Sequence, residues 1–130
     1  MRCSRIASIV LAGLLAQPAL AAEPGCSVAL TRGAASPQGT DSTMRVAGDG
    51  RACAVELLGV PAERRNPATA MRVTRPPANG SVQFDSGRAV YRAHRGFSGN
   101  DGFAIEADAL GNANQPIVLR VRVAVTVTAP

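Results

Sequence analysis

The end of this 130-residue chain alternates apolar and polar side chains more regularly than any other segment. From Ile117 to Thr128, every second residue is aliphatic, and arginine and threonine fill most of the positions between. Successive side chains of a β-strand point to opposite faces of the sheet, so a period of two is typical of a strand. Alternation over this length predicts a strand with one buried and one solvated face.

Shorter apolar runs separated by turn residues precede this strand, and no stretch between residues 23 and 130 keeps a helical period. Strands are expected at residues 26–31, 43–47, 51–58, 69–74, 81–84, 88–92 and 102–108. Gly48–Gly50 is expected to join the second and third of these in a hairpin, and Asp85–Gly87 to join the fifth and sixth. Seven or eight short antiparallel strands with turns at this spacing predict an all-β fold, a β-sandwich.

The first residues have the order of a secretory signal peptide. Arg2 and Arg5 form a basic start, the apolar run Ile6–Leu15 follows, and the small residues Ala19–Ala22 end it. The apolar run is shorter than the roughly 20 residues that span a bilayer. We therefore expect a cleaved signal peptide at residues 1–22, a single domain at residues 23–130 with no membrane span, and a periplasmic or secreted location.

Cys26 and Cys53 remain after residue 22, while Cys3 leaves with the signal peptide. An even pair of cysteines in an exported chain favours a disulfide between them. Closing this 27-residue separation would stabilise the fold by roughly 3–4 kcal/mol in the chain-entropy model. A metal-binding or redox thiol pair is the alternative, but the chain has no Cys-x-x-Cys and only one histidine.

The charge balance of the domain is mildly basic. The whole chain has 14 basic and nine acidic side chains, and Arg2 and Arg5 are the two basic ones before residue 23, so the domain carries a net charge of +3. Nucleic-acid binding would need a clustered basic face with stacking aromatics. The four aromatic side chains are instead expected in the core: Phe84, Tyr91, Phe97 and Phe103. Phe97 lies in a polar loop and is expected to cover one end of the core.

The segment Met71–Thr128 resembles bacterial Ig-like, cadherin-like repeats. The residues that carry the resemblance are Pro77-Ala78-Asn79-Gly80-Ser81-Val82, Gly87, Tyr91, Gly96-Phe97-Ser98-Gly99, Asp101, Phe103 and the closing valine strand. Ala93 departs from the family pattern, which has proline there. This chain has one copy, whereas such repeats usually form tandem arrays. The resemblance implies an Ig-like or cadherin-like β-sandwich.

Cadherin-like repeats can bind calcium through side-chain oxygens, so the resemblance gives calcium candidates. They are Asp85, Asn100, Asp101, Asp108 and Asn112. No Asp-x-Asp-x-Asp run is present, and Asp101 has a simpler structural role, because its carboxylate can accept backbone N–H bonds in the turn at residues 99–102. We therefore expect no metal and no cofactor.

Catalysis has few candidate residues. Ser98, His94 and Asp101 could form a hydrolase triad, but all three lie in one loop and no Gly-x-Ser-x-Gly elbow is present. Copper binding through Met44, Met71 and His94 is conceivable, but both methionines occupy inward strand positions. We therefore expect that the protein is not an enzyme.

These patterns favour an exported, non-enzymatic Ig-like module that binds a protein or glycan of the cell envelope. It would act through an exposed sheet edge or through surface loops. The most polar segment is Gly59–Ala68, which is expected to be either a long surface loop or a short helical turn. The alternative is an envelope structural or assembly subunit that associates by edge-strand pairing. A metal-binding protein or small hydrolase is a further alternative. Nucleic acid is not an expected partner.

Overall fold

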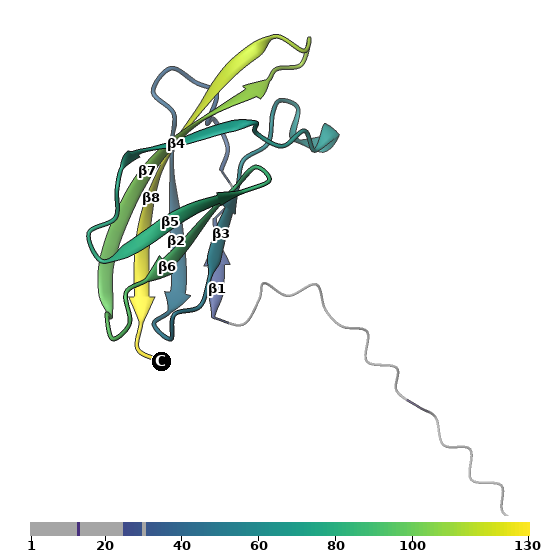
Figure 1. The fold of residues 1–130 in the computed structure, drawn as a ribbon. Helices are drawn as coiled ribbons and strands as arrows, with labels where there is room; N and C mark the ends of the chain where they lie inside the picture. The colour runs from purple at the N-terminus through teal and green to yellow at the C-terminus, as the bar shows by residue number, and fades with distance from the viewer. Residues whose placement is uncertain (1–12, 14–24, 30) are drawn as a thin grey trace, which may run out of the picture.

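The computed structural model describes residue 13, residues 25–29 and residues 31–130 (Figure 1). The predicted signal peptide, residues 1–22, lies outside the described residues except for Gly13. The described part contains eight strands and one turn of 3₁₀ helix. They are β1 (Cys26–Val28), β2 (Thr40–Ala47), β3 (Cys53–Glu56), η1 (Ala62–Arg64), β4 (Ala70–Arg75), β5 (Gly80–Asp85), β6 (Arg88–Ala93), β7 (Gly99–Leu110) and β8 (Pro116–Thr128).

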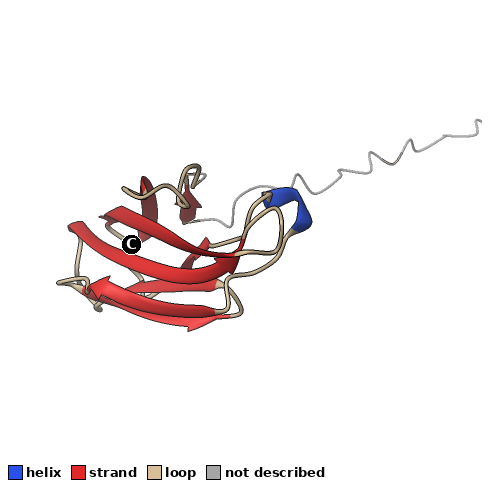
Figure 2. Cartoon of the chain, turned by 90° about the horizontal axis from the view of Figure 1, so that it is seen from above, coloured by secondary structure: helices blue, strands red, loops and turns tan. Residues whose placement is uncertain are grey.

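The strands form two sheets that pack together as a β-sandwich (Figures 1 and 2). The larger sheet has the strand order β1-β2-β8-β7-β4, and the smaller sheet has the order β3-β6-β5. The predicted all-β sandwich is therefore confirmed. β8 has almost the bounds expected for the last strand, residues 117–128, whereas β7 has 12 residues and extends beyond the expected 102–108 at both ends.

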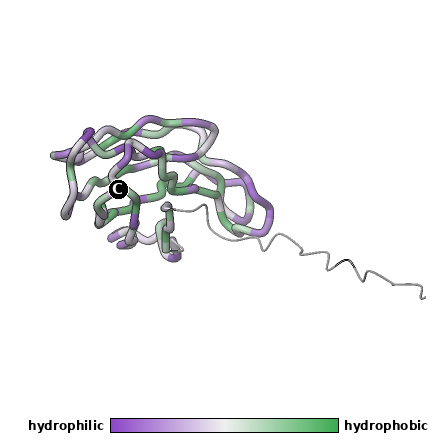
Figure 3. Tube along the Cα trace, turned by 90° about the horizontal axis from the view of Figure 1, so that it is seen from below, coloured by the Kyte–Doolittle hydropathy of each residue, from purple (hydrophilic) through white to green (hydrophobic). Residues whose placement is uncertain are grey.

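The hairpin of β7 and β8 forms the centre of the larger sheet. Phe103 pairs with Val123 and Ile105 with Val121, and all four side chains are buried. The predicted alternation of β8 is confirmed, because its aliphatic residues from Leu119 to Val127 face the smaller sheet and its arginines face outward. Alternation of this kind along the strands is visible in the hydropathy of the chain (Figure 3).

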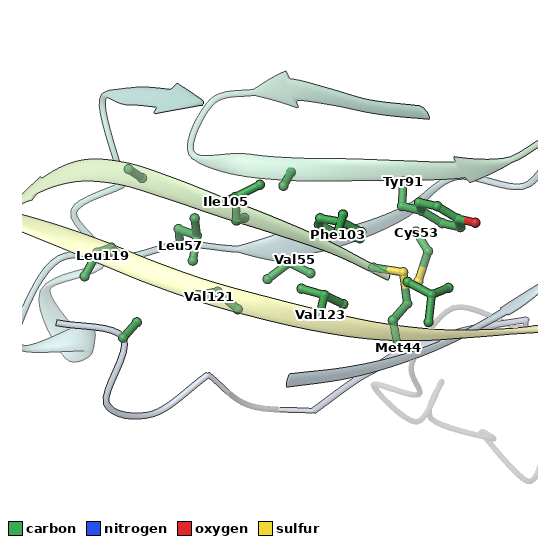
Figure 4. Close-up of a cluster of buried hydrophobic side chains, with 14 of the residues drawn as sticks. Met44, Cys53, Val55, Leu57, Tyr91, Phe103, Ile105, Leu119, Val121 and Val123 are labelled. Atoms are coloured by element: carbon green, nitrogen blue, oxygen red, sulfur yellow. The ribbon is translucent and has the colours of Figure 1, made fainter. Parts of the chain in front are cut away.

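The core lies between the two sheets and is built from small aliphatic side chains around two rings (Figure 4). The rings of Tyr91 and Phe103 stack with their centroids 5.8 Å apart and an angle of 7° between their planes. Phe97 is half-buried against this core, as predicted. The prediction for Phe84 was wrong: 39% of its surface is exposed, because it lies on β5 at the end of the smaller sheet.

The hairpin predicted between residues 43–47 and 51–58 does not form. β2 belongs to the larger sheet, where it pairs with β1 antiparallel and with β8 in parallel, so the expectation of purely antiparallel strands was also wrong. The turn at Gly48–Gly50 instead takes the chain across to the smaller sheet. A Cβ at Gly48 would lie 2.8 Å from the carbonyl oxygen of Phe97 and 2.9 Å from that of Thr128, so close backbone approach requires this glycine.

The hairpin of β5 and β6 is confirmed. Ser86 and Gly87 form its two-residue turn, with φ of 48° and 80°. Positive φ at both central residues is the requirement of a type I′ turn, whose twist matches that of the flanking strands. Ala89 and Tyr91 on β6 face inward and are fully buried, as expected from the alternation.

Cys26 and Cys53 form a disulfide, as predicted from the sequence. Cys26 lies on β1 in the larger sheet and Cys53 on β3 in the smaller one, so the bond joins the two layers at one side of the sandwich (Figure 4). Cys53 is 1% exposed and belongs to the core.

Candidate functional site

Among the predicted site residues, Asp101 has the side chain that forms the most hydrogen bonds. It lies near the start of β7, and its carboxylate accepts hydrogen bonds from the hydroxyl of Tyr91 at 2.8 Å and from the backbone N–H groups of Ala78, Asn79 and Gly102 at 2.9 to 3.1 Å. The bond from Gly102 is the local contact predicted from the sequence. The other three link β6 and the β4–β5 loop to β7, so Asp101 is a structural anchor between the two sheets.

This arrangement argues against the hydrolase triad. The residues 25–29 and 31–130 contain no hydrogen bond that joins the side chains of His94, Ser98 and Asp101. His94 uses its backbone instead, donating from N–H to the carbonyl of Asn79 and accepting from the N–H of Phe97. Both His94 and Ser98 are exposed. The prediction that all three lie in one loop was wrong: His94 and Ser98 lie in the β6–β7 loop, whereas Asp101 lies on β7, where its carboxylate bonds Tyr91 and backbone N–H groups.

Burial raises the pKa of Tyr91, and the hydrogen bond to Asp101 and the negative charge of that carboxylate raise it further. Tyr91 is fully buried, so an ionised phenolate would lose its hydration and face a carboxylate. Tyr91 therefore keeps its proton, and its hydrogen bond to Asp101, at an alkaline pH at which an ordinary tyrosine ionises.

The structure does not bring the calcium candidates together. Asp85 on β5 forms a 2.8 Å ion pair with Arg88, and Asp108 on β7 forms a 3.4 Å ion pair with Arg72. The remaining candidates are Asn100 and Asp101 at the start of β7 and Asn112 in the β7–β8 loop. The part of the chain that the structure describes contains no group of three or more His, Cys, Asp and Glu side chains placed to hold a metal ion.

The copper candidates are also separated. Met44 is 1% exposed and lies in the core, while Met71 on β4 is half-buried against it. His94 lies exposed in the β6–β7 loop. Both methionines therefore serve packing.

Two hollows lie beside β3. The larger, with a volume of about 630 Å³, has walls from β1, β3 and η1, with Arg32, Glu56 and Glu63 among its lining residues. The carboxylate of Glu56 forms an ion pair with Arg65 at 2.9 Å. The smaller, of about 430 Å³, is lined in part by Ala54 and by arginines of β6. Charges of both signs line these hollows, so their electrostatics do not favour ligands of one charge.

Each sheet has two end strands, and three of these four are protected against pairing with another chain. β1 has only three residues, and β3 has four and is held to β1 by the disulfide. β4 has a register shift between Val73 and Arg75, which interrupts its regular pairing. Short length, bulges and charges are devices that block edge-to-edge association.

β5 is the unprotected end strand. Its six residues Gly80–Asp85, all of which the structure describes, contain no proline and no register shift, and Asp85, the sole charge, is paired with Arg88. The N–H of His94 donates a hydrogen bond to the carbonyl of Asn79. Asn79 and every second residue after it on β5 therefore direct their backbone groups towards β6. Gly80, Val82 and Phe84 therefore direct their N–H and C=O groups away from the sheet.

The edge of β5 also exposes apolar surface. Phe84 is one of three large hydrophobic side chains that are exposed in the described part of the chain, and Val82 beside it is half-buried. Their cross-strand partners Ala89 and Tyr91 are fully buried, so both side chains point to the inner face of the smaller sheet. We define Gly80, Val82 and Phe84 as the β5 edge. Their outward backbone groups and the exposed ring make this edge the candidate binding site.

The comparisons with known proteins add no family to this description. No family model, curated protein or solved structure matches the chain. The β5 edge was not singled out from the sequence, because the order of strands in a sheet is set by long-range pairing. The available signal was the run Gly-Ser-Val-Gln-Phe-Asp, which lacks the lysine or proline of a protected edge.

Proposed function

We propose that this protein is an exported, non-enzymatic Ig-like module that binds another polypeptide of the cell envelope through the β5 edge. The observation that carries the proposal is the β5 edge itself: three residues with outward backbone groups beside an exposed phenylalanine. An extended segment of a partner would add to the smaller sheet as a fourth strand, next to β5.

The strand order supports the Ig-like part of the proposal. In the immunoglobulin fold, strands B, E and D are neighbours in one sheet and strands C, F and G in the other. The orders β3-β6-β5 and β4-β7-β8 follow the same sequence of neighbours. The disulfide differs, because it joins β1 to β3 rather than the central strands of the two sheets that antibody domains connect.

Two observations support export. The disulfide is of the kind that persists in oxidising compartments such as the periplasm and the extracellular space. Residues 1–22 have the composition of a signal peptide. Within the described ranges, no helix has the length and apolar character to cross a membrane.

Backbone geometry supports a polypeptide as the ligand rather than a glycan. Along a strand, every second residue directs its N–H and C=O to the same side, about 7 Å from the next such residue. Gly80, Val82 and Phe84 have this spacing, which an extended peptide matches and a sugar chain does not. Each added hydrogen bond contributes about 0.5–1.5 kcal/mol, and covering Phe84 adds the hydrophobic term.

The engagement of Asp101 supports a non-enzymatic role. Its carboxylate, the best placed general base among the predicted candidates, already accepts hydrogen bonds from Tyr91 and three backbone groups. A base in this state has no free position for a substrate proton. The predicted sites for metal are dispersed across the fold.

Site-specific photo-crosslinking tests the proposal. A photoreactive amino acid replaces Phe84 in one strain and Val60 in another. The two residues are similarly exposed, at 39% and 42%, but Val60 lies in the β3–β4 loop. The proposal expects a discrete polypeptide adduct from position 84 and none from position 60. Adducts from position 60 alone, or from neither position, would overturn it.

A further inference from the structure

We propose that the polypeptide bound at the β5 edge is a second copy of this chain, whose β5 pairs antiparallel with the first about a twofold axis that passes between the two Val82 residues. This inference rests on the proposed function, because it names the partner of the same edge. It follows from the match of the edge to itself, in its backbone groups, its side-chain sizes and its charges.

The backbone groups of the β5 edge form a symmetric set. Gly80, Val82 and Phe84 direct their N–H and C=O groups outward, and Val82 lies midway between the other two. In the antiparallel register centred on Val82, Gly80 lies opposite Phe84 of the second copy, and Val82 lies opposite its counterpart. All three are then hydrogen-bonded pairs, in which two residues exchange both of their N–H···O bonds. No outward group of the edge is left without a partner.

The side chains of the inner face match in size. Phe84, the largest of the three, faces Gly80 of the second copy, which has no side chain. Gly80 lies under the ring of Tyr91: a Cβ added there would be 2.5 Å from Cε2 of that ring. The exposed ring of Phe84 would therefore extend towards Tyr91 of the second copy. Aromatic side chains that lie across a glycine in a neighbouring strand stabilise such edges.

The outer face matches in charge. The register sets Ser81 opposite Gln83 of the second copy, and Asp85 opposite its Asn79. Ser81 and Gln83 are neutral hydrogen-bonding side chains, and Asp85 faces an amide instead of another carboxylate. Like charges directly opposite each other would destabilise the strand pair, and this register sets none opposite each other.

Such a dimer has one continuous smaller sheet of six strands, ordered β3-β6-β5-β5-β6-β3. It removes the unprotected end strand, and its new ends are the two copies of β3, which are short and held by the disulfide. Twofold symmetry closes the assembly, so strand addition stops at two copies.

Sedimentation of the purified oxidised protein over a concentration series into the millimolar range is the first test. We expect a concentration-dependent dimer. Val82→Pro removes an outward N–H that the monomer does not use, and it removes one hydrogen bond at each of two symmetric positions in the dimer. We expect the dimer dissociation constant to rise about tenfold or more.

Ala54→Pro is the matched control. The N–H of Leu57 donates a hydrogen bond to the carbonyl of Gly87, so Leu57 and every second residue before it direct their backbone groups towards β6. Ala54 lies between two of these residues and directs its backbone groups away from β6. Ala54→Pro therefore alters the other edge of the same sheet, and the dimer should persist. Circular dichroism melting checks that each variant folds. A monomeric wild type throughout the series, or a dimer that survives Val82→Pro, would overturn the proposal.

A charge exchange tests the register even where the proline variant does not fold. Ser81→Lys with Gln83→Lys sets lysines opposite lysines in the homodimer, and Ser81→Glu with Gln83→Glu does the same with carboxylates. Each double variant alone should be monomeric, and an equimolar mixture should form a heterodimer. No association in the mixture would contradict the register.

The crosslinking experiment separates the two proposals. An adduct from position 84 with the mass of two copies supports the second copy as the partner. An adduct with a different polypeptide overturns this inference while leaving the proposed function intact. Failure to capture any polypeptide at position 84 overturns both.

Discussion

The hydroxyl of Tyr91 donates a 2.8 Å hydrogen bond to Asp101, and this bond joins β6 of the smaller sheet to β7 of the larger one. The same carboxylate holds two backbone N–H groups of the β4–β5 loop. The loop leads directly into β5, so this one side chain sets where the β5 edge begins.

Asp101→Ala should lower the free energy of unfolding by about 3 kcal/mol, because it leaves the buried Tyr91 hydroxyl and nearby backbone donors without their acceptor. Tyr91→Phe should cost about 1–2 kcal/mol. Urea denaturation of both single variants and the double variant gives the coupling energy, expected at about 1 kcal/mol. Asp85→Ala is the control, since its carboxylate pairs with Arg88 in solvent and should be close to neutral. Additive effects of Asp101 and Tyr91 would contradict the direct bond.

Stability should fall at alkaline pH because of Tyr91. The fold raises its pKa above the ordinary value of 10.0, so the native state keeps the phenolic proton when the unfolded chain releases it. The stabilisation is complete below pH 10 and is lost progressively as the pH rises above that value. Tyr91 is the only tyrosine and the chain has no tryptophan, so tyrosinate absorbance reports this residue alone. We expect the absorbance to rise together with unfolding. Ionisation near the ordinary pKa in folded protein would refute the explanation.

Loss of the disulfide should destabilise the domain by roughly 3–4 kcal/mol and lower its melting temperature by roughly 10 °C or more. The bond closes a separation of 27 residues and joins the two layers at β1 and β3. Calorimetry of the double variant Cys26→Ala with Cys53→Ala, compared with reduced wild type, measures the effect. The two samples should agree, and an unchanged melting temperature in both would mean that the bond contributes nothing to stability.

Truncation of Phe84 should destabilise the monomer much less than truncation of Phe103. Phe103 is fully buried between the sheets, so Phe103→Ala should cost about 3–5 kcal/mol. Phe84 is 39% exposed at the β5 edge, so Phe84→Ala should cost the monomer less than about 1.5 kcal/mol. Urea denaturation at low protein concentration compares the two. Equal losses would show that Phe84 belongs to the core after all.

Local patterns predicted the elements that depend on local chemistry. The alternation of valines predicted β8, because a period of two needs no knowledge of the partner strand. The composition of Asp85–Gly87 predicted the β5–β6 turn, since a tight turn is set by the backbone preferences of its own residues. The pairing of Cys26 with Cys53 was predicted because these two cysteines follow the expected signal peptide in a chain expected to be exported.

The misjudged features depend on long-range contacts. Gly48–Gly50 has the composition of a hairpin turn, but Gly48 is required by its contact with the backbone of Phe97 and Thr128, far along the chain. The partners of Asp101 include Tyr91 and the β4–β5 loop, which no spacing in the sequence indicates. Phe84 lies on an end strand of its sheet, and only the order of the strands shows which strands lie at the ends. The candidate site therefore could not be located from local pattern.

The parallel pairing of β2 with β8 couples two segments that lie far apart in the chain. Thr40 is the partner of Val121, and β1 pairs with β2 and with no other strand of its sheet. Contacts of such long sequence separation carry a loop-closure cost before they stabilise anything, which slows folding. Any process that delivers this chain in order, by synthesis or by translocation, delivers β2 well before its partner. The larger sheet therefore cannot be completed until β8, the last strand of the chain, is available to pair with β2.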